Sequence, residues 1–393
     1  MIQLLIRDPK QLKPVKILLE ENNWLNKSRK IENNDGVFSV FTLLTDLADG
    51  LLEFDHCFYT DTPPSKRTLK SVVQEYCHAK REPLVFEVPK KWSIYPPMIL
   101  FNANIEQKHW PRELCEKVLE HQSELFGTSG ITHLAVNRPI VQTDVMRRPF
   151  NIVPLYGDFG PDLAMDHRPT SADFQDAFWC HVVQNGVYQT WAPRYTMFSR
   201  GNIKEKKRIL DNCKNLQGNI VVDYYCGIGY FALSYLRNGA KVLCWDINPW
   251  SIEGFRRALS HAGYRYKIYH RDSDVFKVED LSDLDACVFL ESNEFIHSRL
   301  ASVVAPGSLN IKHVNLGLLP TSRPSWQSAL SLVREKSTTK ATVHVHENVH
   351  VDDFEELKEE ISAAFGGSHV THLEKVKTFA PDVWHVVCDV DVT

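Results

Sequence analysis

Alternation of short apolar runs with stretches of helical spacing is the feature that most constrains the fold, and it fills the chain from residue 219 onward. The apolar runs lie at 219–225, 241–246 and 265–272. Short strands separated by helices form βαβ units, whose strands pair in parallel and whose crossovers are right-handed. The pattern therefore predicts an α/β fold over residues 201–393, built on a Rossmann-like, mostly parallel sheet.

Two features at the end of this domain refine the prediction. The apolar runs 371–380 and 384–392 are separated by a very short link that contains Pro381-Asp382, so they can form only a hairpin, and the sheet should end with an antiparallel strand. Segment 285–307 leaves two possibilities open. It supplies the fourth parallel strand with its helix, or it is an insertion before a true fourth strand at 313–318.

The remaining chain is long enough for further domains. A length of 393 residues suits two or three domains, and 43% hydrophobic with 24% charged residues is typical of folded proteins. We expect residues 1–140 to form an N-terminal α+β accessory domain and residues 141–200 a small α+β linker domain. Asn185-Gly186, between two apolar runs, predicts a β-hairpin inside the linker domain.

Composition also limits the compartment and the partners. The N-terminal apolar run is interrupted by charge too early for a secretory signal, and no stretch is long enough to span a membrane. The nine cysteines are scattered and form no CxxC pair, which favours reduced thiols in a cytoplasmic protein. A net charge of −4 means that any contact with nucleic acid must come from local basic patches, such as the one within residues 1–30.

A ligand site is predicted at the first strand-to-helix turn. Gly227 and Gly229 would let backbone amides approach a ligand, and Asp223 ends the strand where open α/β sheets bind ligands. Tyr225 and Phe231 flank the glycines in place of the tight G-x-G-x-x-G turn, which favours an S-adenosylmethionine (AdoMet) site over a dinucleotide site.

Polar residues at the next two strand ends extend this site. Asp246 is placed to bind a ribose diol, although an ordinary helix-capping acid before Asn248 is the alternative. Asp272 and Ser273 could meet an adenine edge, but alone they would indicate no more than a turn. Acidic or hydroxyl residues at three consecutive strand ends together favour a nucleoside ligand.

At this point the sequence resembles a known family. The segments WAPRYTMFSRGNIKEKKRI, DYYCGIGYF, DINP and HVNLGLLPTSRPSW, within residues 147–393, resemble the aminocarboxypropyltransferases of tRNA wybutosine synthesis, relatives of the tRNA guanine-N1 methyltransferases. The resemblance implies an AdoMet-methyltransferase fold and transfer of the 3-amino-3-carboxypropyl group of AdoMet. The implied acceptor is C7 of 4-demethylwyosine, next to the anticodon of phenylalanine tRNA, and methylthioadenosine is released. By analogy, residues 1–140 would help to grip the tRNA body.

The resemblance also assigns roles to single residues. Ser199 and Lys206 match cofactor-contacting positions and would hold the methionine carboxylate, whereas charge alone favours a solvated helix face or a phosphate contact for Lys206. Asp246 replaces a glutamate that is common in the family. The loop Asn315–Pro320 is longer than the Asn-Leu-Pro or Asn-Pro-Pro loop of base-methylating relatives, which favours transfer of the larger group. Asn315 and Asp223 are the candidate catalytic residues.

Aromatic and cationic residues before the cofactor domain suggest an RNA surface. Arg194, Tyr195 and Arg200, with Asn315 and Pro320, are the candidate substrate-binding residues, and a packed domain junction is the alternative for the aromatics. No residue stands out as an obligatory general base, so Asp223 or water would accept the proton, and no metal site is expected. His344, His346 and His350 share a strand face by alternation, but no Cys or carboxylate partner stands at ligand spacing.

Two other functions stay open. A tRNA guanine-N1 methyltransferase would leave S-adenosylhomocysteine, whereas a noncatalytic tRNA-binding protein with a degenerate cofactor fold would not bind AdoMet. The choice of transferred group rests on the resemblance, because the residues by themselves do not select it.

Overall fold

The computed structural model describes residues 1–34, 36–60, 67–81, 83, 88–102, 110–138, 144–149, 152–303 and 309–393. The chain divides into two compact units, Met1–Val72 and Val73–Thr393, and each is described by itself. Among the described residues, no helix combines the length and the apolar content needed to cross a membrane.

The first unit is a small antiparallel sheet packed against one helix. Its strands are β1 (Ile2–Ile6), β2 (Glu32–Asn34), β3 (Val37–Phe41) and β4 (Asp55–Phe58), in the order β2-β3-β1-β4, with a 3-10 turn at Asp49–Leu51. Helix α1 (Pro9–Glu21) begins after Asp8, whose side chain accepts the Lys10 N–H. Val15 and Leu19 of α1 pack on Leu4 of β1, so the helix holds one face of the sheet away from water.

The second unit begins with a mixed four-stranded sheet. Its strands are β5 (Lys91–Tyr95), β6 (Met98–Asn102), β7 (His133–Asn137) and β8 (Val153–Tyr156), in that order, and the nearby helices are α2 (Leu69–Lys80), α3 (Arg112–Glu120) and α4 (Gln122–Phe126). Strands β7 and β8 pair with each other. The domain boundary expected near residue 140 therefore falls inside a sheet.

The predicted hairpin is present. Strands β9 (Cys180–Gln184) and β10 (Val187–Trp191) pair antiparallel, and the turn residues Asn185 and Gly186 have φ of +52° and +73°. Positive φ at both central residues is what a two-residue I′ turn requires, which explains the Asn-Gly pair. The short helix α5 (Ser171–Asp176) precedes the hairpin and is capped by Thr170.

The main sheet has eight strands. They are β11 (Ile220–Asp223), β12 (Lys241–Asp246), β13 (Tyr266–His270), β14 (Ala286–Leu290), β15 (Ile311–Leu316), β16 (Ala341–His350), β17 (Val370–Ala380) and β18 (Val383–Val392). Their order is β13-β14-β12-β11-β15-β16-β18-β17, and β18 runs antiparallel to both of its neighbours. The predicted mostly parallel sheet with a C-terminal antiparallel hairpin is confirmed.

Residues 285–303, the described part of segment 285–307, add a strand of their own, as the insertion alternative expects, and residues 304–307 lie outside the described residues. β15 pairs with β11, so β15 is the fourth strand of the βαβ series, whereas β14 lies between β12 and β13. β13 is consequently displaced by one strand from β12. This displacement decides which side chains surround the ligand site.

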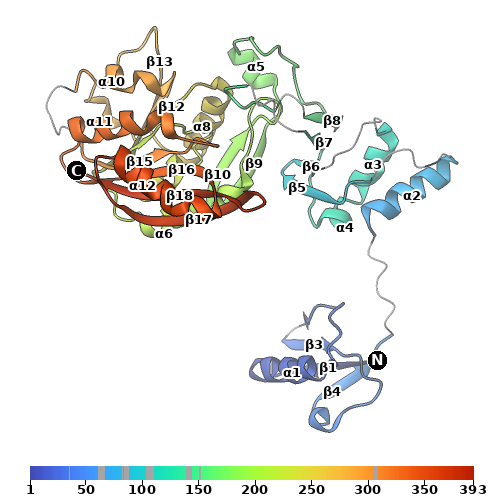
Figure 1. The fold of residues 1–393 in the computed structure, drawn as a ribbon. Coiled ribbons are helices and arrows are strands. Elements are labelled where there is room, and N and C mark those ends of the chain that lie inside the picture. Colours follow the sequence, from blue (N-terminus) through green and yellow to red (C-terminus); the bar gives the residue numbers. More distant parts are fainter. Residues whose placement is uncertain are drawn as a thin grey trace. The chain divides into compact units, whose positions relative to one another are not determined.

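Helices cover both faces of the main sheet (Figure 1). One face carries α6 (Ile203–Asn212), α7 (Ala232–Arg237) and α8 (Pro249–Ala262), which pack on Val221 and Val242. The other face carries α10 (Ile296–Arg299), α11 (Trp326–Lys336) and α12 (Phe354–Ala364), which pack on Val222 and Leu243. Helix α9 (Asp280–Asp283) and 3-10 turns at Arg200–Asn202, Asn293–Phe295, Arg323–Ser325 and Val351–Asp353 complete the elements. The ends of the parallel strands lie between these two layers.

Candidate active site

The turn after β11 requires glycine at two positions. Gly227 and Gly229 have φ of +53° and +79°, in the left-handed region. A Cβ at Gly227 would lie 2.7 Å from the Tyr230 ring, and one at Gly229 would lie 2.4 Å from the Phe255 ring. Gly227 lines a cavity, whereas Gly229 closes the packing of the turn on α8. The two predicted glycines therefore have different tasks.

The cavity opens where the parallel strands end. It has a volume of about 450 Å³, in the range of small-molecule sites, and its lining comes from the ends of β11, β12, β14 and β15 and from the segments 145–147 and 196–202. Ser199, Gly227 and Asp246 are the predicted cofactor-binding residues that line it. The loop residues 317–319 line it as well, directly before Pro320.

Asp246 is oriented by the backbone around it. Its Oδ2 accepts the Gly227 N–H at 2.9 Å and its Oδ1 accepts the Asn248 N–H at 2.8 Å. Burial raises the pKa of this carboxyl to about 6, against the lowering effect of the hydrogen bonds from these N–H groups. Each oxygen has a lone pair left, so the carboxylate can still accept hydroxyl groups from the cavity.

Asp223 and Asn315 lie together beneath the cavity. Both are fully buried, and Asn315 Nδ2 donates to Asp223 Oδ1 at 3.3 Å. Burial raises the pKa of Asp223 to about 7, with the charge of Asp246 adding to the rise. Asp223 Oδ2 and Asn315 Oδ1 have no hydrogen-bond partner, which is costly for buried oxygens. The two predicted catalytic residues are therefore brought together, but neither is among the described residues of the lining.

Of the predicted carboxylate-binding pair, Ser199 lines the cavity, whereas Lys206 is not among the described residues of its lining. The Ser199 Oγ accepts from Lys377 Nζ at 3.3 Å. Lys206 is 2% exposed and donates to Gln189 at 2.6 Å, and its ammonium lies 5.2 Å from the centroid of the Tyr230 ring. Burial lowers the pKa of Lys206 to about 7. The alternatives of a solvated helix face or a phosphate contact are both wrong for Lys206, because its ammonium does not reach the surface.

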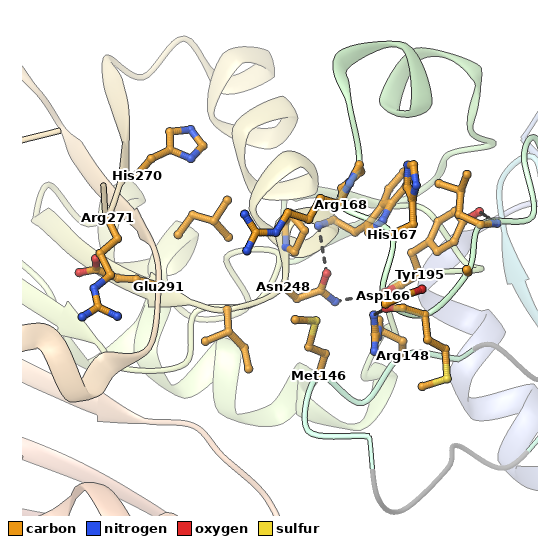
Figure 2. A pocket seen from close by; sticks show the side chains of 18 of the residues that line it. Met146, Arg148, Asp166, His167, Arg168, Tyr195, Asn248, His270, Arg271 and Glu291 are labelled. Carbon is orange, nitrogen blue, oxygen red and sulfur yellow. Dashed lines mark hydrogen bonds between the residues drawn. The ribbon is translucent and has the colours of Figure 1, made fainter. Parts of the chain in front are cut away.

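A second cavity adjoins the first (Figure 2). It measures about 730 Å³ and shares Ile247, Asn248 and Glu291 with the first cavity. His270 and Arg271 lie on one side and Arg168 faces them from the other. Asp272 and Ser273, the predicted adenine-edge pair, and Tyr195 line this second cavity. The displacement of β13 by β14 accounts for this, because Asp272 and Ser273 no longer end the strand beside Asp246.

The other predicted substrate residues are dispersed. Arg194 forms an ion pair with Asp162 at 3.1 Å, and Tyr195 is buried and stacks on Trp250 at 4.0 Å. Arg200 is exposed, and Pro320 is exposed beside the cavity-lining loop. The stacking of Tyr195 favours the packed-junction alternative for this aromatic. Trp191, close by in the sequence, is also buried and stacks on Phe198 at 4.4 Å.

Sequence reasoning missed several residues of the lining. Arg147 lines the first cavity, has φ of +53°, and donates to Leu319 O at 2.5 Å. Ser292 and Asn293 line it from the end of β14. Polar residues directly after an apolar strand were a signal for Ser292 and Asn293, but their relevance depended on the unpredicted place of β14 in the sheet. Arg147 stands in a turn-rich segment and gave no signal.

The three histidines of β16 do not form a group of their own. His344 is 3.0 Å from His313 and 2.6 Å from Asp389, His346 is 3.0 Å from His385, and His350 lies at the exposed end of the strand. The structure therefore supplies partners that spacing along the sequence could not show.

Known proteins resemble this chain in sequence over most of its length. A model of the TRM5/TYW2 methyltransferase domain matches residues 181–314. The tRNA wybutosine-synthesizing proteins 2 of Saccharomyces cerevisiae and Schizosaccharomyces pombe are 38% and 39% identical, over 79% and 81% of this chain and 75% and 76% of theirs. This chain belongs to the tRNA wybutosine-synthesizing protein 2 family. The fold class, the family and the AdoMet-dependent transferase class predicted from the sequence are confirmed.

Solved structures extend the likeness of the fold. TYW2 of P. horikoshii in complex with MeSAdo has a TM-score of 0.52 at 19% identity, over 82% of this chain and 98% of that one. Trm5b of Pyrococcus abyssi has a TM-score of 0.55 at 14% identity and is covered in full, as is this chain. At these identities the likeness concerns the fold alone.

Proposed function

We propose that this enzyme transfers the 3-amino-3-carboxypropyl group of AdoMet to C7 of 4-demethylwyosine, next to the anticodon of phenylalanine tRNA. The substrate is a tRNA, and a cytoplasmic location is part of the proposal, supported by nine cysteines that form no disulfide. The observation that carries the proposal is the first cavity, in which Asp246, Ser199, Arg147 and the loop 317–319 meet in a member of this family.

The reaction needs little from the protein beyond positioning. The ring carbon attacks the methionine Cγ, the Cγ–S bond breaks, and its electron pair stays on the sulfur of methylthioadenosine. The ring then loses the proton from the attacked carbon to a base. AdoMet supplies the activation, and the enzyme must align Cγ with the nucleophile. With a pKa of about 7, Asp223 is suited to accept a proton, through water because it is covered.

We assign the adenosine part to Asp246 and the second cavity. Asp246 would accept both ribose hydroxyls, and the adenine would pass Ile247 toward Asp272 and Ser273. This orientation leaves the methionine arm in the first cavity. Gly227 would keep the turn close enough for backbone amides to contact the ligand.

The methionine carboxylate needs a cation, and two are candidates. Among the described residues that line the first cavity, Arg147 is the one with a positive charge, and Ser199 offers a hydroxyl. Lys206, which the family resemblance assigns, lies behind Tyr230. The positions of Arg147 and Ser199 in the cavity lining favour these two residues as the partners of the carboxylate. Lys206 instead donates hydrogen bonds to Gln184 and Gln189. A guanidinium pairs with a carboxylate through two parallel hydrogen bonds.

Product analysis tests the proposed transfer. The enzyme is incubated with AdoMet and with phenylalanine tRNA that carries 4-demethylwyosine, and the small-molecule product is identified by mass spectrometry. Methylthioadenosine is expected. S-adenosylhomocysteine would instead indicate the guanine-N1 methyltransferase alternative, and AdoMet that stays unbound while tRNA binds would indicate a noncatalytic protein.

A further inference from the structure

One part of the main sheet is polar where the packing rules call for apolar side chains. Beneath α6 and α7, strands β11 and β12 bury Val221, Val242 and Cys244. The same face of β15, β16 and β18 instead buries His313, His344, His346, His385 and Asp389. Buried polar groups are costly unless they are paired or bind an ion, so this polar region calls for an explanation.

Three metal-binding side chains converge there from separate elements. Cys213 follows α6, His313 lies on β15 and His344 lies on β16. One donor atom of each lies within 4.8 Å of the other two, and the nearest ring nitrogens of His313 and His344 are 3.0 Å apart. A thiolate with two imidazoles at this spacing is the donor set that Zn²⁺ prefers.

A carboxylate stands behind one of the imidazoles. Asp389 Oδ1 is 2.6 Å from His344 Nδ1, so a proton between them leaves the lone pair on His344 Nε2, the nitrogen that faces His313. Carboxylate, histidine and metal in this sequence form the usual outer support of zinc sites, because the carboxylate fixes the tautomer and the ring.

The charges around the cluster also favour a cation. Glu205 is fully buried, Asp389 is nearly so, and Arg208 bridges the two with contacts of 2.7 Å and 2.6 Å. Two carboxylates against one guanidinium leave one negative charge uncompensated in the protein interior. A thiolate at Cys213 would add a second, and a divalent cation would balance both.

An unpartnered hydroxyl faces the same cluster. Tyr235 Oη is buried and has no hydrogen-bond partner, and the Tyr235 ring lies 5.5 Å from the ring of His313. A water on a fourth metal position would give this hydroxyl a partner.

A chain of hydrogen bonds is the alternative. His313 could donate to His344, and His344 to Asp389, which would satisfy these three groups without a metal. These hydrogen bonds give the Cys213 thiol and the Tyr235 hydroxyl no role. The uncompensated negative charge of the two carboxylates would then have to be balanced by a protonated imidazole.

We propose that Cys213, His313 and His344 bind a Zn²⁺ ion, with a water in the fourth position. The ion would fix the end of α6 to β15 and β16, and so position the segment with Ser199 that precedes α6. This revises the expectation of no metal, which rested on spacing along the sequence. The zinc site is separate from the two cavities of the proposed reaction, so the zinc proposal does not depend on that reaction.

Metal analysis of the full-length enzyme tests the proposal. After reconstitution with Zn²⁺ and removal of excess, about one zinc per chain is expected. Replacement by Co²⁺ should give the charge-transfer absorption of a thiolate–cobalt bond. Zn²⁺ should also raise the melting temperature of the metal-free enzyme, since binding favours the folded state.

Matched cysteine variants locate the ligands. Cys213→Ala should lose the zinc, the cobalt band and the stabilisation by Zn²⁺, and His344→Gln should lose the zinc. Cys287→Ala removes a buried thiol on β14, outside the cluster, and should retain all three. The proposal is overturned if the wild-type enzyme binds no zinc and forms no thiolate–cobalt band, or if Cys213→Ala binds zinc as the wild type does. The first outcome would favour the hydrogen-bond chain.

Discussion

Replacing Asp246 with alanine is the most informative single change for the cofactor site. The carboxylate lines the first cavity and is held by the N–H groups of Gly227 and Asn248 at 2.9 Å and 2.8 Å. Because both contacts come from the backbone, the carboxylate is in place before the ligand arrives. Asp246→Ala therefore removes an oriented acceptor and does not merely remove charge.

The structure gives two separate costs for Asp246→Ala. Hydrogen bonds to a charged group contribute about 1.5 to 3 kcal/mol, so loss of the ribose contact should weaken AdoMet binding by about 12- to 150-fold. The Gly227 and Asn248 N–H groups also lose their acceptor. They border the cavity, where water can replace the carboxylate, so we expect a fall in unfolding free energy of no more than about 1 to 3 kcal/mol.

Calorimetric titration with AdoMet and with methylthioadenosine separates these costs. Both ligands carry the ribose, so the variant should lose affinity for both by a similar factor. Asp285→Ala is the matched control, because Asp285 also accepts a backbone N–H, that of Arg265 at 2.8 Å, but lines neither cavity. Normal affinity in a folded Asp246→Ala enzyme, or an equal loss in the control, would refute the assignment of the ribose to Asp246.

Four further outcomes are expected. If Arg147 holds the methionine carboxylate, Arg147→Ala should bind AdoMet at least about tenfold more weakly but methylthioadenosine normally. The wild-type enzyme should also take up no proton when it binds AdoMet at pH 8. Proton uptake, measured by calorimetry in buffers of different ionisation enthalpy, would instead implicate Lys206, whose pKa is about 7. AdoMet affinity should fall as pH drops below about 6, where the Asp246 carboxyl becomes protonated, and this fall should vanish in Asp246→Asn. Gly229→Ala should destabilise the enzyme more than Gly218→Ala in urea unfolding, because both have positive φ but only the former meets another side chain. Deleting residues 1–66 should weaken tRNA binding and leave AdoMet binding unchanged; loss of both would indicate a folding role.

The parts of the fold that could be predicted depend on short-range signals. Asn185-Gly186 specifies its own turn, and the C-terminal hairpin follows from the short link at Pro381-Asp382. The turn with Gly227 and Gly229 was predictable because positive φ is encoded by glycine itself. In each case the residues that decide the structure lie within a few positions of one another.

Long-range packing decided what the sequence could not show. In the sequence of α6, Lys206 stands among other cations. The pattern of α6 does not predict that Gln184 and Gln189 of the β9–β10 hairpin accept the hydrogen bonds of Lys206. Likewise, Cys213 is about a hundred residues from His313 along the chain, so no spacing rule could bring them together.

The inserted strand shows how one such event changes a binding site. Neighbouring strands lie about 4.8 Å apart, so placing β14 between β12 and β13 moves the end of β13 away from Asp246 by about that distance. The end of β14, with Ser292 and Asn293, takes the place beside Asp246 in the first cavity. Asp272 and Ser273 then border the second, larger cavity, which shares Ile247 with the first in its lining. The place of β14 therefore decides the nucleoside side of the site, whereas the turn at Gly227 and the loop 317–319 follow β11 and β15, which pair directly with each other.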